Sequence, residues 1–135
     1  MSPVCVFESQ SQLDETLYYW QNKLFLNDWI ITAEVASLRE IGLDDRCGEN
    51  ELDVEGKVSH IRILSADDFP DDYRLKICQE KILVHELLHC KLNLLSPDDS
   101  FESRFYDMFD HQRLEELAKT LIMVKYNLHF NWFRK

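Results

Sequence analysis

The sequence has few of the residues that interrupt a folded chain. Of its 135 residues only three are glycine and three are proline, and it contains no repeat and no low-complexity tract. Linkers and domain boundaries are usually built from such residues, so few positions suit them. A chain of this length can bury a sizeable hydrophobic core. We therefore expect one domain over residues 1–135.

Basic residues are also scarce. Fifteen lysines and arginines face 25 aspartates and glutamates, which gives a formal net charge of −10. Recognition of a phosphate backbone needs clustered Lys and Arg, so the composition argues against a nucleic-acid partner. The acidic residues gather in pairs such as Asp44-Asp45 and Asp98-Asp99. We expect these pairs in solvated loops and at helix starts.

Long apolar runs are absent as well. No run approaches the roughly 20 residues that cross a bilayer, and residues 1–8 lack the basic and apolar segments of a signal peptide. We therefore expect no membrane partner and a cytoplasmic protein. In that compartment cysteines without a C-x-x-C pair are typically reduced and buried. The four cysteines of this kind are Cys5, Cys47, Cys78 and Cys90.

Hydrophobic periodicity in the first half predicts a helix followed by strands. Residues 9–25 carry apolar side chains at helical spacing, and residues 29–36 are rich in β-branched and aromatic side chains. The acidic region 39–56 is interpreted as mainly loop with some irregular strand. In residues 57–64 the side chains alternate well between a more polar face with His60 and Arg62 and a more apolar face with Ile61 and Ile63. This pattern is typical of a half-buried strand, and we place the strand at a sheet edge.

The second half predicts two helices. Asp67 to Asp72 combine cap candidates, a proline and acidic residues, so we expect a helix from about Asp71 to Leu94. It is apolar on nearly every side, which indicates a buried central helix. A last helix is clearest from Asp110 to Tyr126. The expected fold class is α+β, with a small mixed or antiparallel sheet packed on the buried helix and with flanking N- and C-terminal helices.

The buried helix carries the motif His85-Glu86-Leu87-Leu88-His89. Positions i and i+4 lie on one helix face, so the two imidazoles can bind one Zn²⁺ while Glu86 acts as general base on the attacking water. Polar side chains in a buried helix destabilise the fold unless a partner satisfies them. A metal ion is such a partner, so the motif predicts zinc as cofactor.

A catalytic zinc site usually has three protein ligands, so a third must come from elsewhere. The metzincin pattern places glycine and histidine where this chain has Leu92 and Leu95, which excludes that class. The third ligand must therefore lie later in the chain. The candidates are His111, Glu115, Glu116 and His129.

A helical wheel separates these candidates. His111 falls within the apolar stripe that contains Leu114, Glu115 falls on its border, and Glu116 faces solvent. His129 lies in the C-terminal tail. We predict His111 as the third ligand, with Glu115 as the hydrogen-bond acceptor that supports it. In the alternative, Glu115 is itself the third ligand.

The chain resembles the small zinc metallopeptidases of phages and prophages, which are relatives of the minigluzincins and of ImmA/IrrE-type proteases. The resemblance covers most of residues 13–125 and is specific mainly at the motif from His85 to His89. It implies a minimal zincin-like fold in which an edge strand beside the metal helix pairs with an extended peptide. Many relatives use glutamate as third ligand, whereas this chain offers His111 at the matching position.

These features predict a zinc-dependent metallopeptidase that acts on a peptide or protein substrate. Glu86 would accept the proton of water and pass it to the leaving amine. The strand over residues 57–64 would hold substrate by β-augmentation. The sequence identifies no group that stabilises the oxyanion; Tyr106 and Tyr126 are available, but no pattern selects either of them. Two other readings are a zinc-stabilised interaction protein without turnover and an acidic decoy or regulatory protein.

Overall fold

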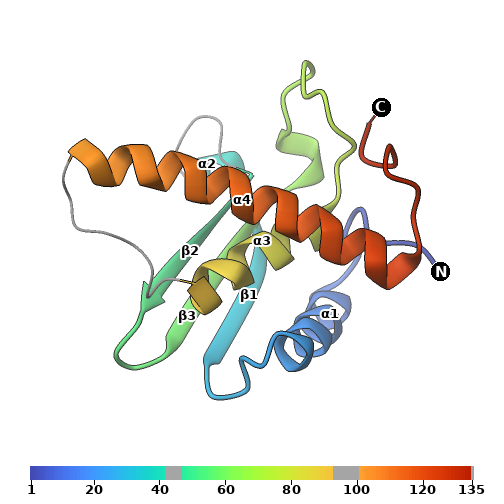
Figure 1. Ribbon diagram of the computed structural model, residues 1–135. Helices are drawn as coiled ribbons and strands as arrows, with labels where there is room; N and C mark the ends of the chain where they lie inside the picture. The colour runs from blue at the N-terminus through green and yellow to red at the C-terminus, as the bar shows by residue number, and fades with distance from the viewer. Residues whose placement is uncertain (42–46, 93–100, 135) are drawn as a thin grey trace.

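The computed structural model describes residues 1–41, 47–92 and 101–134, and for residues 101–110 it describes the backbone alone. This part of the chain forms four α-helices, a 3-10 helix and a mixed three-stranded sheet (Figure 1). The predicted α+β class is therefore confirmed. Two acidic pairs used above, Asp44-Asp45 and Asp98-Asp99, lie outside the described residues, as does Leu94.

The sheet contains β1 (Ile30–Ala36), β2 (Gly48–Asp53) and β3 (Val58–Leu64) in the order β1-β3-β2. β1 pairs with β3 in parallel, and β2 pairs with β3 in antiparallel orientation. The prediction that residues 57–64 form an edge strand is therefore wrong, because β3 lies in the centre. Alternation of polar and apolar side chains indicates that one face of a strand is buried. It does not indicate whether the strand has a neighbour on one side or on both.

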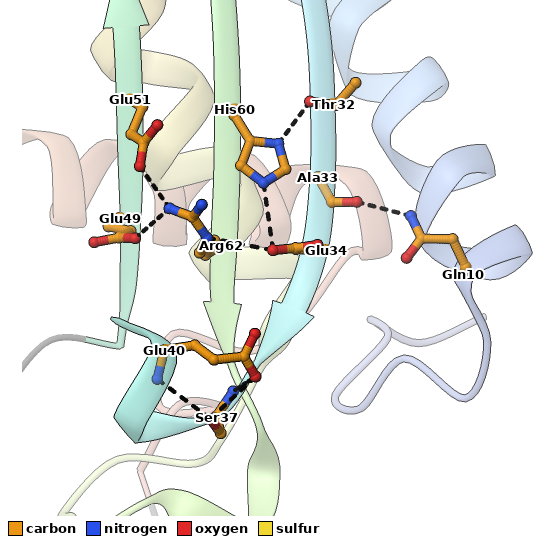
Figure 2. A network of polar contacts seen from close by, with 10 residues as sticks. All are labelled: Gln10, Thr32, Ala33, Glu34, Ser37, Glu40, Glu49, Glu51, His60 and Arg62. Atoms are coloured by element: carbon orange, nitrogen blue, oxygen red, sulfur yellow. Dashed lines mark hydrogen bonds and ion pairs between the residues drawn. The ribbon is translucent and has the colours of Figure 1, made fainter. Parts of the chain in front are cut away.

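The two faces of β3 differ in their partners. Ser59, Ile61 and Ile63 are buried on the inner face. On the outer face Arg62 binds the carboxylates of neighbours on both sides, and His60 contacts β1 (Figure 2). These cross-strand contacts explain how a central strand carries polar side chains on one face.

Helix α1 (Gln10–Lys23) matches the predicted first helix. Ser9 caps it, because its hydroxyl accepts a hydrogen bond from the Gln12 amide at 3.1 Å. Its apolar stripe, with Leu13 fully buried, packs toward β1 and α3. The Gln10 side chain donates to the Ala33 carbonyl of β1 at 2.7 Å. A short helix, α2 (Leu38–Ile41), follows β1.

Helix α3 (Gln79–Leu92) begins later than predicted. The acidic segment instead forms a 3-10 helix, η1 (Ala66–Asp68), and the next residues pair with the C-terminal tail, where the Lys76 amide donates to the Phe133 carbonyl at 2.7 Å. The Gln79 amide donates to the Cys5 carbonyl, at 2.9 Å. The start of α3 is thus set by distant segments of the chain, which local cap patterns do not contain.

The central position of α3 confirms the prediction of a buried helix. It contacts β2 and β3 on one side, and α1 and α4 on others. Helix α4 (Phe101–Tyr126) contains the predicted segment 110–126 and crosses α3 (Figure 1). No helix in residues 1–41, 47–92 or 101–134 has the length and apolar character needed to span a membrane.

Candidate metal centre

Three histidines meet between α3 and α4. His85 and His89 lie one turn apart on α3, and His111 comes from α4. The ring centroid of His85 lies 5.1 Å from that of His89 and 4.5 Å from that of His111. One ring nitrogen from each residue lies within 4.8 Å of the other two, so the group could hold a metal ion. The structure thus brings together the two motif histidines and the preferred third candidate.

The orientation of His85 fits a metal ion directly. Its Nδ1 donates to Glu115 Oε2 at 2.8 Å, because a carboxylate can only accept. Its Nε2 is buried and has no hydrogen-bond partner, in a residue that is only 4% exposed. A buried polar atom without a partner is destabilising and uncommon. A metal ion bound at Nε2 would supply the missing partner.

Glu115 takes a supporting role beside His85. Its second oxygen forms an ion pair with Lys81, whose side chain is almost fully buried. Burial alone would raise the pKa of Glu115, but the hydrogen bond from His85 and the charge of Lys81 outweigh it and lower the pKa to about 2. We had expected Glu115 to support His111, and the structure pairs it with His85 instead.

Lys81 is a member of the site that the sequence reasoning missed. It lies one turn before His85 on the same face of α3, and it lines the same cleft as the histidines. A buried lysine is rare unless it is paired. A lysine four residues before the first histidine, and therefore on the same face of a buried helix, was the signal that could have identified it.

His89 is prepared for metal binding at neutral pH. Burial, together with the neighbouring His85 and His111, lowers the pKa of His89 to about 4. Metals bind the neutral imidazole, so protons do not compete for this ligand until the solution is strongly acidic.

Glu86 lines the same cleft and is 7% exposed. Strand β2 packs against α3 at this residue, where the Asn50 side chain donates a hydrogen bond to the main-chain carbonyl of Glu86 at 2.8 Å. Gly48 permits this approach. A Cβ at that position would lie 2.8 Å from Ile82 Cγ2 and 3.2 Å from Glu86 Oε2. The glycine is therefore needed for close packing of β2 on the part of α3 that carries the predicted base.

The histidines and Glu86 border a cleft of about 470 Å³. Tyr73, half-buried in the segment before α3, also lines the cleft, as does Cys47. Burial, together with the neighbouring Cys47, raises the pKa of Tyr73 well above its usual range, so its hydroxyl stays a donor. Sequence reasoning missed Tyr73 because it lies where a helix was expected.

The two tyrosines named from the sequence do not take this place. The Tyr126 hydroxyl donates to Glu80 at 2.7 Å, on another side of α3. The side chain of Tyr106 lies outside the described residues.

The remaining candidates also lie apart from the histidine group. Glu116 is exposed beside Lys119, which confirms that it faces solvent. His129 contacts Asn131 in the tail, and His60 lies on the outer face of the sheet. His111 was expected within a buried stripe, yet it is exposed. The buried face of α4 is instead formed by Leu114, Ala118 and Ile122.

Cys90, which directly follows His89, points away from the histidines as its helical position requires. The Asn50 side chain donates to its sulfur at 3.4 Å. All four cysteines are free thiols, and two of them, Cys78 and Cys90, are buried. The prediction of unpaired thiols is therefore confirmed.

Comparison with known proteins does not assign this chain to a family. No protein-family model matches this chain, and neither does any curated protein or solved structure. The interpretation of the site therefore rests on the geometry of its own residues. That geometry comprises three convergent imidazoles, a buried ring nitrogen that lacks a partner, and a buried glutamate beside them.

Proposed function

We propose that this protein is a zinc-dependent metallopeptidase with a minimal zincin-like fold. The observation that carries the proposal is the buried, unpartnered Nε2 of His85 within a group of three convergent imidazoles. Imidazole nitrogen suits zinc, and three protein ligands leave a fourth position for water or substrate. His85, His89 and His111 would hold the ion, and Glu115 would fix the tautomer of His85.

The chain supplies the other groups that peptide hydrolysis needs. Bound zinc would act as a Lewis acid that lowers the pKa of water and polarises the scissile carbonyl. Glu86 would accept the proton from water and deliver it to the leaving amine. The Tyr73 hydroxyl, which is held protonated, would donate a hydrogen bond to the carbonyl oxygen as negative charge develops there.

Strand β2 takes the substrate-binding role that we first gave to residues 57–64. β3 has neighbours on both sides and has no free edge, whereas β2 pairs with β3 alone among the described strands. β2 also lines the cleft that contains Glu86 and the histidines. An extended peptide added to its outer edge would therefore pass the reacting groups.

The test of this function is the substitution Glu86→Gln. A glutamine has the same shape and cannot accept the proton, so we expect cleavage of a peptide library to fall by roughly 10²–10⁴-fold while zinc stays bound. Glu116→Gln removes the same charge from an exposed position on α4, and it should cleave like the wild type.

Zinc content and cleavage together separate the alternatives. Zinc without cleavage, or cleavage that survives Glu86→Gln, would show an interaction protein or a different reaction. If the protein holds no zinc after purification without chelators, the hypothesis of an acidic decoy or regulatory protein is supported.

A further inference from the structure

The free edge of β2 presents a regular set of main-chain groups. The Leu64 amide donates to the Cys47 carbonyl at 2.8 Å, which marks these two residues as a hydrogen-bonded pair. Along antiparallel strands hydrogen-bonded pairs alternate with pairs that form no hydrogen bond to each other. Gly48, Asn50 and Leu52 belong to the second kind, so their main-chain N–H and C=O groups point away from β3. Among residues 1–41, 47–92 and 101–134, no strand pairs with that edge.

The outward-facing side chains of the same strand are all acidic. Glu49, Glu51 and Asp53 alternate with Asn50 and Leu52, and they stand opposite Arg62, His60 and Val58 of β3. Figure 2 shows Glu49 and Glu51 on one side of Arg62 and Glu34 of β1 on the other.

These acids outnumber the positive charge beside them. Arg62 serves three carboxylates at once, from Glu34, Glu49 and Glu51, and this guanidinium lowers the pKa of Glu51. The side chain of Glu51 is 67% exposed, so it remains open to a second cation. Glu49, Glu51 and Asp53, which we call the acidic row of β2, thus keep a net negative charge at neutral pH.

We propose that β2 selects extended peptides that carry a basic side chain at every second position. In a β-ladder, side chains of neighbouring strands lie directly opposite each other. A peptide on the free edge would therefore set every second side chain beside Glu49, Glu51 and Asp53, where lysine or arginine is favoured. The intervening side chains would lie beside Asn50 and Leu52.

A second observation places a ligand site beside the same strand. Residues 48–50 and Leu52 line the cleft that His85 also lines, and the buried Nε2 of His85 has no partner. The substrate preference rests on the proposed function, because it assumes that the peptide on β2 is the one presented to Glu86. The preference itself concerns only the charge of the peptide, so binding can test it without cleavage.

Binding tests this preference without relying on turnover. The zinc-loaded Glu86→Gln protein is titrated into three labelled short peptides, and fluorescence anisotropy is recorded. One peptide alternates lysine with valine, one has the same composition in two blocks, and one alternates glutamate with valine. We expect the alternating lysine peptide to bind most tightly and the glutamate peptide to bind least.

Three further charge variants locate the effect. Glu51→Gln, added to the same protein, should weaken binding of the alternating lysine peptide by about two- to five-fold, the usual size of one cross-strand charge pair. Glu15→Gln removes an exposed charge from α1 and should leave binding unchanged. Asp53→Asn offers a second position on β2, and its expected effect has the same sign as that of Glu51→Gln.

The outcomes are distinct from those for the peptidase activity. Equal binding of the glutamate and lysine peptides, or equal losses in Glu51→Gln and Glu15→Gln, would overturn the preference for alternating basic residues. Equal binding of the alternating and block peptides would do the same. Cleavage of neutral library peptides by the wild type would still support the peptidase. Selective binding without any cleavage would support the preference and contradict the peptidase.

Discussion

Helix α3 contributes a buried residue to each of two polar clusters, Glu80 to one and His85 to the other. Glu80 is fully buried, and its carboxylate receives hydrogen bonds or an ion pair from four residues, which are Val4, Trp20, Lys125 and Tyr126. We call this set the Glu80 cluster. The histidine cluster contains His85, His89 and His111. Its member His85 is almost as deeply buried, yet one ring nitrogen has no partner.

The difference separates a structural cluster from a functional one. The chain itself satisfies Glu80, and in doing so it ties the N-terminal segment, α1 and α4 to the start of α3. A buried polar group that the chain leaves unsatisfied indicates an external partner. We therefore expect the Glu80 cluster to determine stability without metal, and the histidine cluster to determine metal affinity.

The largest expected effect is the loss of stability caused by Glu80→Ala. Removal of the carboxylate leaves the Lys125 ammonium mostly buried without its counter-ion, and breaking such a pair costs about 3–5 kcal/mol. Urea unfolding of the metal-free protein measures this loss. Glu80→Gln, which keeps the side-chain shape, should lose less and is the second variant to use if Glu80→Ala does not fold. A loss below about 1 kcal/mol would mean that the cluster is not structural.

Glu115→Ala should weaken zinc binding by roughly 10–100-fold, the usual effect of removing a group that supports a ligand. The protein should still bind one zinc ion. Titration with a competing chelator measures the affinity, and Glu116→Ala on the exposed side of α4 serves as control. A complete loss of zinc, as large as that for a direct ligand, would favour the alternative in which Glu115 is the third ligand.

Metal-free protein should lose stability as the pH falls from about 6.5 to 4. Burial and the neighbouring imidazoles lower the pKa of His89 from 6.5 to about 4, so the unfolded chain binds a proton in this window and the folded chain does not. Allowing for partial exposure, the loss is about 2 kcal/mol. His89→Gln should reduce this pH dependence in urea unfolding, and His129→Gln should not. An unchanged slope in His89→Gln would contradict this cause.

The smallest expected effect concerns the contact between β2 and α3. Gly48→Ala places a methyl group against Ile82, which has to move, and we expect a loss of about 1 kcal/mol together with reduced cleavage. Gly56→Ala is the control for stability, because the atoms nearest to its Cβ belong to the Asp53 side chain, which can move. Thermal unfolding compares the two variants, and peptide cleavage compares Gly48→Ala with the wild type. Equal effects in both would show that Gly48 has no special role.

The sequence predicted those parts of the site that depend on local spacing. His85, Glu86 and His89 share a helix, so their relation follows from the helical repeat. His111 of α4 joins them as predicted, although it is exposed and does not lie in the buried stripe where the helical wheel put it. Parts that depend on distant contacts were missed. Examples are the late start of α3, which distant main-chain groups cap, and the central place of β3 in the sheet.

The same limit applies to the supporting residues. Tyr73 reaches the cleft from a segment that was expected to be helical, and Lys81 acquires its partner from α4. Glu115 was placed correctly at the border of the buried face, but a helical wheel contains a single helix. It could not show that the recipient of its hydrogen bond would be His85 on α3.

Zinc titration of the metal-free wild type and of His111→Ala tests the central claim most directly. We predict that the wild type binds one zinc ion per chain tightly. We also predict that His111→Ala loses more affinity than the roughly 10–100-fold expected for a supporting residue. Wild-type protein that binds no zinc, or a His111→Ala variant that binds zinc as tightly as the wild type, would contradict the three-histidine site.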